Sequence, residues 1–109
     1  MSTPKDGWLD RGGVRLHYVE WTPDGSGPDA PPALLLHGLS SNARYWDRVA
    51  GHLQDRRLIA LDQRGHGLTG LPPNAPDPAG GYSMDELLDD AVHVIREMGL
   101  EKPIVVGHS

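Results

Sequence analysis

The chain has 109 residues, a formal net charge of −5 and no cysteine. Its basic residues are scattered, with Arg56 and Arg57 the one adjacent pair, so no basic stripe points to nucleic acid or a membrane surface. The lack of cysteine excludes disulfide bonds, zinc–thiolate sites and a thiol nucleophile. No apolar signal-peptide core precedes Trp8, and no run approaches the ~20 apolar residues of a transmembrane helix. We therefore expect a globular, cytoplasmic protein that binds neither nucleic acid nor a membrane.

Two kinds of apolar pattern predict strands. Apolar and polar residues alternate over Val14–Trp21, which is typical of a half-buried strand, and a short strand at 8–9 precedes it across a glycine turn. Continuous apolar runs at 33–36, 58–61 and 103–106 are typical of strands that are buried on both faces. Buried strands that alternate with helices predict a parallel sheet covered on both sides.

Two segments between the apolar runs are predicted to be helices. The first has apolar residues at near-helical spacing, namely Ala43, Trp46, Val49, Ala50 and Leu53. In the second, Ser83 as N-cap and Glu86 three residues later form a capping box. Tyr82 and Leu87 occupy the positions of a hydrophobic staple. Gly99 is the expected C-terminal cap of this helix.

Each continuous apolar run leads into a segment rich in chemistry-bearing residues. These segments are 37–39 (His-Gly-Leu), 62–67 (Asp-Gln-Arg-Gly-His-Gly) and 107–109 (Gly-His-Ser). The carboxyl ends of parallel strands meet at one edge of a sheet, where open α/β sheets build their sites. A Gly-x-Ser directly after a strand opens a nucleophile elbow, Gly-x-Ser-x-Gly, which holds a serine hydroxyl up for attack. The sequence therefore predicts a site at this edge of the sheet.

In this order the motifs resemble the N-terminal part of an α/β-hydrolase. Strands of that family lead in turn into His-Gly, Asp-x-Arg-Gly-x-Gly and Gly-x-Ser-x-Gly, and the resemblance runs over nearly all of this chain. It implies the α/β class and the N-terminal part of a mostly parallel α/β-hydrolase sheet with helices on both faces. Residues 1–109 would be the N-terminal portion of a single domain that is incomplete without a C-terminal portion.

The resemblance assigns roles to residues at the strand ends. Ser109 would be the catalytic nucleophile, which attacks a substrate carbonyl and forms an acyl-enzyme. Leu39 would offer its backbone N–H to the oxyanion hole, while the second donor would belong to the residue after Ser109. His37, Gly38 and His108 would line the site, and His37 would orient the oxyanion loop. The alternative interpretations are that Ser109 caps a following helix and that His37 and Gly38 only turn the chain out of the strand.

The histidines do not complete a catalytic triad. In the family the triad runs Ser, acid, His along the chain, and all six histidines precede the candidate serine, so none fits as the general base. A metal site of His37, His66 and His108 lacks a recognisable ligand spacing, so we expect neither a metal nor a cofactor. Asp62 and Arg64 are expected to brace their own loop by an ion pair.

Departures from related enzymes narrow the chemistry that the resemblance implies. Epoxide hydrolases and dehalogenases of this fold use an aspartate nucleophile, whereas the elbow here carries Ser109, and Ser40 stands where epoxide hydrolases usually have proline. Leu39 replaces the second glycine of many lipases and carbon–carbon bond hydrolases. We therefore expect a serine esterase or lactonase, with proline aminopeptidases and cofactor-free perhydrolases as near alternatives. A non-catalytic binding protein is the alternative of another class; phosphate binding by the glycines at 65–70 is disfavoured because no helix follows them.

Ester or lactone hydrolysis would need an acid and a histidine that this chain does not supply, because a serine without a base is not activated. We expect both from the C-terminal portion of the same hydrolase, present as a second chain, with a small-molecule ester or lactone as substrate. The chain alone is expected to be inactive. The family's sheet has further strands beside the one at 103–106, so in these residues alone that strand should have a bare apolar edge.

Overall fold

The computed structural model describes residues 4–11, 13–22, 31–38, 41–53, 55–69 and 84–108. No helix within these ranges has the length and apolarity needed to cross a membrane. The elements in these ranges are, in chain order, β1 (Lys5–Arg11), β2 (Val14–Trp21), β3 (Ala33–Leu36), the 3-10 helix η1 (Ala43–Trp46), α1 (Asp47–His52), β4 (Leu58–Leu61), α2 (Met84–Glu97) and β5 (Ile104–Gly107).

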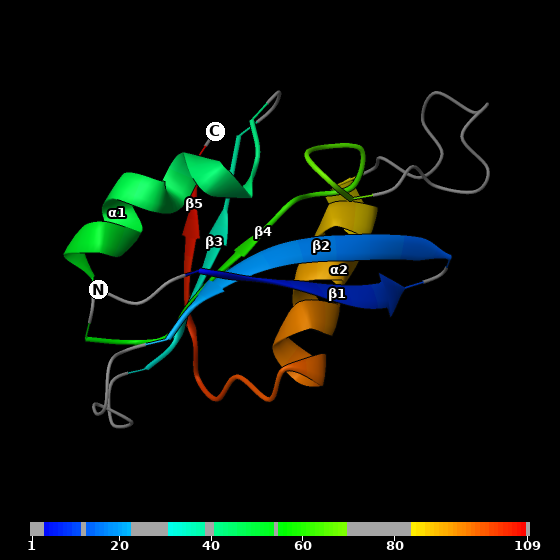
Figure 1. Cartoon of the computed structure of the whole chain (residues 1–109). Helices are drawn as coiled ribbons and strands as arrows, with labels where there is room; N and C mark the ends of the chain where they lie inside the picture. Colours follow the sequence, from blue (N-terminus) through cyan, green and yellow to red (C-terminus); the bar gives the residue numbers. More distant parts are fainter. Residues whose placement is uncertain are drawn as a thin grey trace.

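The strands form one sheet in the order β1-β2-β4-β3-β5 (Figure 1). β3 is parallel to both of its neighbours, β4 and β5, whereas β2 is antiparallel to β1 and to β4. The register pairs Leu36 with Leu61 on one side and with Gly107 on the other, so all three parallel strands end at the same level. The predicted α/β class is confirmed. Among the described strands the sheet is mixed, because β3, β4 and β5 are parallel whereas the opening hairpin is antiparallel.

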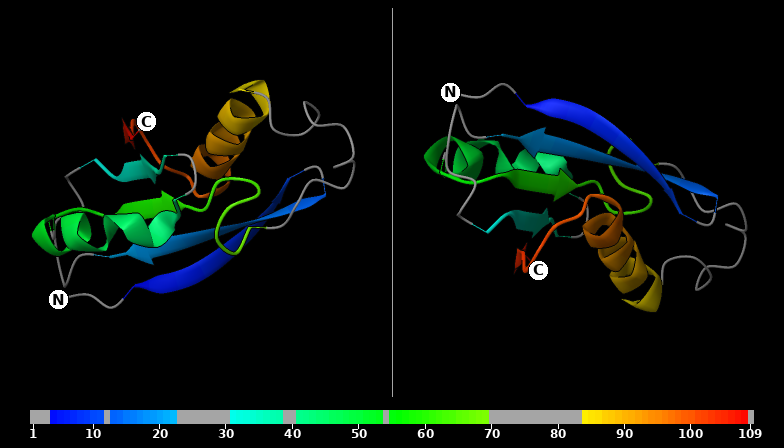
Figure 2. Two further views of the ribbon diagram at one scale, coloured as in Figure 1. Left: turned by 90° about the horizontal axis from the view of Figure 1, so that it is seen from above. Right: turned by 90° about the horizontal axis from the view of Figure 1, so that it is seen from below.

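Helices cover both faces of this sheet. On one face Ala43, Trp46 and Ala50 of η1 and α1 pack into a core with strand residues. On the other face Ala91 and Val94 of α2 pack into a second core. In Figure 1, α1 lies to the left of β3, β4 and β5 and α2 lies to their right, and the views in Figure 2 also keep the two helices apart.

The short apolar runs of β3 and β4 supply both cores, because successive side chains of a strand point to opposite faces. Leu34 packs on the α2 side and Leu35 on the α1 side. β2 departs from its predicted half-buried character. His17 and Val19, on the face expected to be open, are only 3% and 1% exposed. η1 covers Val19, and the segment after β4 covers His17 through a hydrogen bond from the His17 N–H to the Thr69 hydroxyl.

Capping residues mark the helix ends that the structure describes. Asn42 caps η1, its side-chain oxygen accepting the backbone N–H two residues later at 2.9 Å. The single helix predicted here is thus a 3-10 turn that continues into α1. α2 begins at Met84, and Gly99 lies beyond its end at φ +63°, as predicted for its C-terminal cap. The predicted N-cap Ser83 and the staple residue Tyr82 lie outside the described residues.

β5 occupies an edge of the sheet and is exposed along its whole length. Ile104, Val105 and Val106 are 44%, 53% and 37% exposed. The strand is therefore confirmed, but the burial on both faces that its apolar run predicts is not found. Its exposure agrees instead with the bare edge expected when no further strand lies beside it.

Candidate functional site

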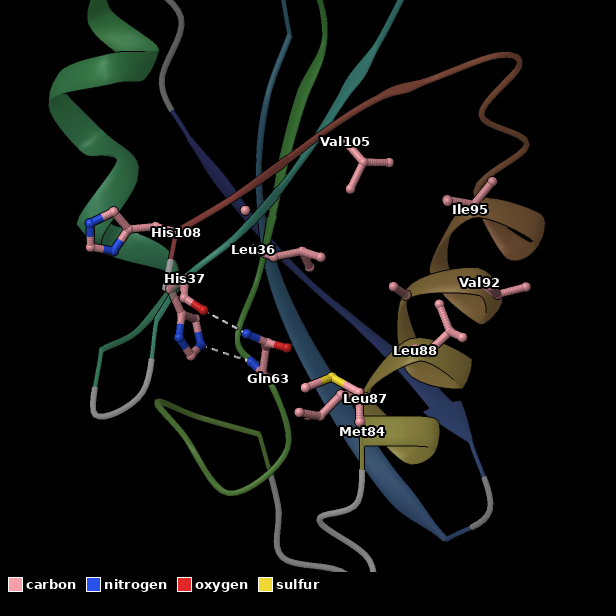
Figure 3. Close-up of a pocket in the computed structure, with 12 residues that line it drawn as sticks. Leu36, His37, Gln63, Met84, Leu87, Leu88, Val92, Ile95, Val105 and His108 are labelled. Carbon is pink, nitrogen blue, oxygen red and sulfur yellow. Dashed lines mark hydrogen bonds between the residues drawn. The ribbon is translucent and has the colours of Figure 1, made fainter.

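The segments that follow β3, β4 and β5 meet at one edge of the sheet (Figure 3). The His108 N–H donates to the Leu36 carbonyl at 3.0 Å, so the chain leaving β5 runs beside the chain leaving β3. This brings the predicted site segments together. Ser109 and Leu39, the predicted nucleophile and oxyanion donor, lie outside the described residues, and their roles stay predictions.

His37 is buried, and both of its ring nitrogens are engaged. The side chain is 2% exposed. Nε2 accepts the backbone N–H of Gln63 at 3.0 Å, so Nδ1 carries the ring proton and donates it to the Gly38 carbonyl at 2.8 Å. Burial lowers the pKa of His37, which favours this neutral ring. His37 therefore acts as a fixed brace of its own loop and has no nitrogen left to serve as a general base.

Gln63 is a site residue that the sequence analysis did not single out. Its side-chain amide donates to the His37 carbonyl at 2.6 Å, beside the bond from its own backbone N–H (dashed lines in Figure 3). His66 packs its ring against that of His37, with the centroids 4.9 Å apart. The only sequence signal for Gln63 is its place, directly after Asp62, in the motif that follows the strand next to β3.

His108 directly follows β5, and its ring neighbour differs from that of His37. Its ring points towards α1, whereas Val105, within β5, points towards α2 (Figure 3). The ring of Tyr45 packs on His108 with a centroid distance of 4.9 Å and a tilt of 34°. Within the described ranges, no group of three or more His, Asp or Glu side chains is arranged to hold a metal ion.

The predicted ion pair between Asp62 and Arg64 is wrong. The Asp62 carboxylate accepts the backbone N–H groups of Ala43 at 2.6 Å and Leu68 at 3.0 Å, and it contacts Nδ1 of His17 at 2.6 Å. A buried carboxylate needs a donor for each oxygen, and the ends of η1 and of the β4 loop provide them. Asp62 thus ties three segments together.

Arg64 turns away from its own loop towards α2. It pairs with Asp90, and its Nη1 also lies 3.1 Å from the Glu86 carboxylate. Arg11 of β1 reaches the same two acids, and its hydrogen bond to Asp90 is the main cause that raises its own pKa. The site edge is therefore braced against α2 and β1 by buried and partly buried charges.

A cavity of about 430 Å³ opens between α2 and β5, next to the His37 brace (Figure 3). Most of its wall is apolar, and polar groups appear at the end formed by the strand termini. The lining residues are Leu36, His37, Gln63, Met84, Leu87, Leu88, Ala91, Val92, Ile95, Val105, Gly107 and His108. Several of them belong to the exposed face of α2, where Met84 and Leu88 are 78% and 59% exposed. The described residues thus leave an apolar groove uncovered beside the candidate site.

Comparison with known proteins identifies relatives for this arrangement. Residues 31–109 match the family described as alpha/beta hydrolase fold. Epoxide hydrolase 1 of Caenorhabditis elegans is 38% identical over 96 residues, which cover 87% of this chain and 22% of that protein. 2-(Acetamidomethylene)succinate hydrolase of Mesorhizobium japonicum is 36% identical over 102 residues, which cover 93% of this chain and 32% of that protein.

Solved structures agree with the sequence comparison. The crystal structure of an α/β hydrolase from Novosphingobium aromaticivorans superimposes with a TM-score of 0.85 at 30% identity, covering 100% of this chain and 36% of that one. The chain therefore spans between 22% and 36% of the length of these relatives.

Proposed function

The chain belongs to the α/β-hydrolase fold family, and from this premise we propose that it forms part of a serine hydrolase of carboxylic esters or lactones. The main support is the meeting of the strand ends, where His108 bonds to the main chain of β3 directly before the braced His37 and Gly38. In the family, these segments carry the nucleophile and the oxyanion loop. The named relatives are hydrolases as well.

In the proposed reaction, the Ser109 hydroxyl gives its proton to the histidine of the C-terminal portion and attacks the carbonyl carbon of the ester. The ester C–O bond then breaks, the alcohol leaves with that proton, and an acyl-enzyme remains. Water hydrolyses the acyl-enzyme, which releases the acid and restores the Ser109 hydroxyl. The Leu39 N–H donates to the oxygen on which negative charge develops. One such donor is worth roughly 3–4 kcal/mol of the activation barrier. His37 cannot act as the base, because the Gln63 N–H occupies its Nε2 and its Nδ1 proton is bound to Gly38.

The missing acid and histidine would come from the C-terminal portion of the same hydrolase, acting as the partner of this chain. Two features of the described residues support such a partner. β5 has an exposed edge, and the groove between α2 and β5 is lined largely by apolar side chains. Covering apolar surface of this kind with another element removes it from water and stabilises the protein.

Epoxide hydrolysis is the second candidate function, because the chain is 38% identical to epoxide hydrolase 1 of Caenorhabditis elegans. It is less well supported, because the family's epoxide hydrolases have an aspartate at the elbow position that Ser109 occupies here. The chain also has Ser40 where those enzymes usually have proline.

Assays of the assembled protein, this chain with its C-terminal portion, test the proposal. We expect hydrolysis of short p-nitrophenyl esters and covalent labelling of Ser109 by a fluorophosphonate probe. Ser109→Ala should abolish both, since loss of a triad member typically costs several orders of magnitude in rate. Ser26→Ala, in the proline- and glycine-rich segment after β2, is the matched control. Unchanged ester turnover in Ser109→Ala would refute the serine mechanism, and turnover of styrene oxide without ester turnover would favour the second candidate.

A further inference from the structure

We propose that Gln63 is a positioning residue, which sets the direction of the oxyanion-hole N–H by clamping His37. This role depends on the proposed function, because only an ester or lactone hydrolase needs that donor. No residue of the loop after β4 was assigned to the reaction by the sequence motifs.

The clamp consists of two hydrogen bonds from Gln63 to His37. The backbone N–H of Gln63 donates to the ring at Nε2 (3.0 Å), and the side-chain amide donates to the main-chain carbonyl of His37 (2.6 Å). One residue of the β4 loop therefore fixes both the ring and the backbone of the residue that leaves β3. Figure 3 shows the two bonds side by side between neighbouring strand ends.

The clamped ring in turn holds the next peptide unit. Its Nδ1–H donates to the Gly38 carbonyl at 2.8 Å. That carbonyl and the Leu39 N–H belong to the same peptide unit, and a trans peptide is planar with its C=O and N–H pointing in opposite directions. Holding the carbonyl therefore also sets where the N–H points. Glycine offers little resistance to rotation of this unit, so its hydrogen bonds decide its orientation. The Ser41 N–H donates to the same carbonyl at 3.2 Å, and the shorter bond from the His37 ring is the one that depends on the clamp.

The clamp is partly buried, with His37 inside the protein and Gln63 half-buried. His37 is 2% exposed, and both clamp residues line the apolar cavity beside α2. An unpaired polar group is costly where it is buried, as the His37 ring is. A side chain without an N–H donor cannot replace the glutamine. Glutamate would place a carboxylate against the His37 carbonyl, and leucine would leave that carbonyl without this donor.

The test uses Gln63→Glu and Gln63→Leu in the assembled protein, with Leu68→Ala as the control. Leu68 lies in the same loop, and its side chain is 62% exposed. We expect kcat on p-nitrophenyl acetate to fall at least about tenfold in both Gln63 variants, since a displaced donor loses part of its effect on the transition state. KM should change less than about threefold, because ground-state binding does not use the donor. The control should match the unmodified protein in both constants.

Hydrogen exchange of the peptide covering residues 37–41 supplies a readout that does not need activity. Exchange should be faster in both Gln63 variants than in the control, with an unchanged thermal midpoint. Unchanged exchange in both variants would overturn the clamp, and so would an unchanged kcat in an active enzyme. A fall of thermal midpoint and kcat together, with faster exchange throughout the chain, would show a structural role only and overturn it as well. If the unmodified protein shows neither ester turnover nor fluorophosphonate labelling, the proposed function fails, and the exchange data still decide the clamp.

Discussion

Arg64 and Asp90 form a buried bidentate ion pair, with Nε 2.7 Å from Oδ2 and Nη2 2.8 Å from Oδ1. Their side chains are 3% and 1% exposed. Arg11 adds a third bond to the same carboxylate, 2.6 Å from its Nε to Oδ1. One carboxylate in the middle of α2 therefore holds the loop after β4 and the first strand of the sheet at the same time.

Asp90→Asn should destabilise the protein by about 3–5 kcal/mol, because it leaves the buried Arg64 and the partly buried Arg11 without their main counter-charge. Urea denaturation of the assembled protein measures this loss. Asp89→Asn is the matched control, since Asp89 is the exposed neighbour on the same helix, and it should cost less than about 0.5 kcal/mol. Equal losses in the two variants would show that the Asp90 pairs contribute nothing specific.

Gly67→Ala should destabilise the β4 loop for two independent reasons. Gly67 has φ +53°, where a residue with a Cβ pays about 1–2 kcal/mol. An added Cβ would also collide with the Asp62 carboxylate, whose hydrogen bonds to Ala43 and Leu68 fix its place. Gly51→Ala in α1 is the control, because its Cβ would meet no atom, and alanine should stabilise this helix by about 0.5–1 kcal/mol. Two variants of equal stability in urea would contradict both reasons.

Those features of the fold that depend on local sequence were predictable, and those that depend on long-range partners were not. The apolar runs predicted β3 and β4 with the bounds that the structure shows, and Gly99 marked the end of α2. The Arg64–Asp90 pair joins residues 26 positions apart, so the sequence suggested the nearer carboxylate of Asp62 instead. Gln63 acquires its role only because β4 lies beside β3, an order that the motifs do not state. The catalytic roles of Ser109 and Leu39 remain predictions.

The neutral state of His37 predicts that acid weakens the fold. Burial lowers its pKa below the ordinary 6.5, so between these two values the unfolded chain binds a proton that the folded chain does not. The contribution of His37 to the free energy of unfolding should therefore not change with pH above pH 6.5. Below that pH the free energy of unfolding should fall, down to the lower pKa of the folded state. Protonation of Nε2 would also break its hydrogen bond with Gln63, because the protonated nitrogen can no longer accept the Gln63 N–H.

Urea denaturation of the assembled protein between about pH 8 and about pH 5 checks this dependence. His37→Gln should remove the contribution of His37 to the slope of the unfolding free energy against pH, whatever the other histidines contribute. His52→Gln, at an exposed position in α1, should leave the slope as it is. Parallel curves for the unmodified protein and His37→Gln would contradict the prediction.

Residues 1–109 expressed alone should associate, because the described part of the chain exposes a strand edge and an apolar groove together. In β5, Ile104, Val105 and Val106 are between 37% and 53% exposed, and an unprotected apolar edge pairs with other chains. Light scattering should detect the association, and circular dichroism should show a transition without cooperativity. Val105→Lys should reduce the scattering, since a charge on an edge strand opposes pairing. Co-expression with the proposed C-terminal portion should remove the association if that portion covers both surfaces. A soluble monomer of residues 1–109 with a cooperative thermal transition would show that these residues need no partner to fold.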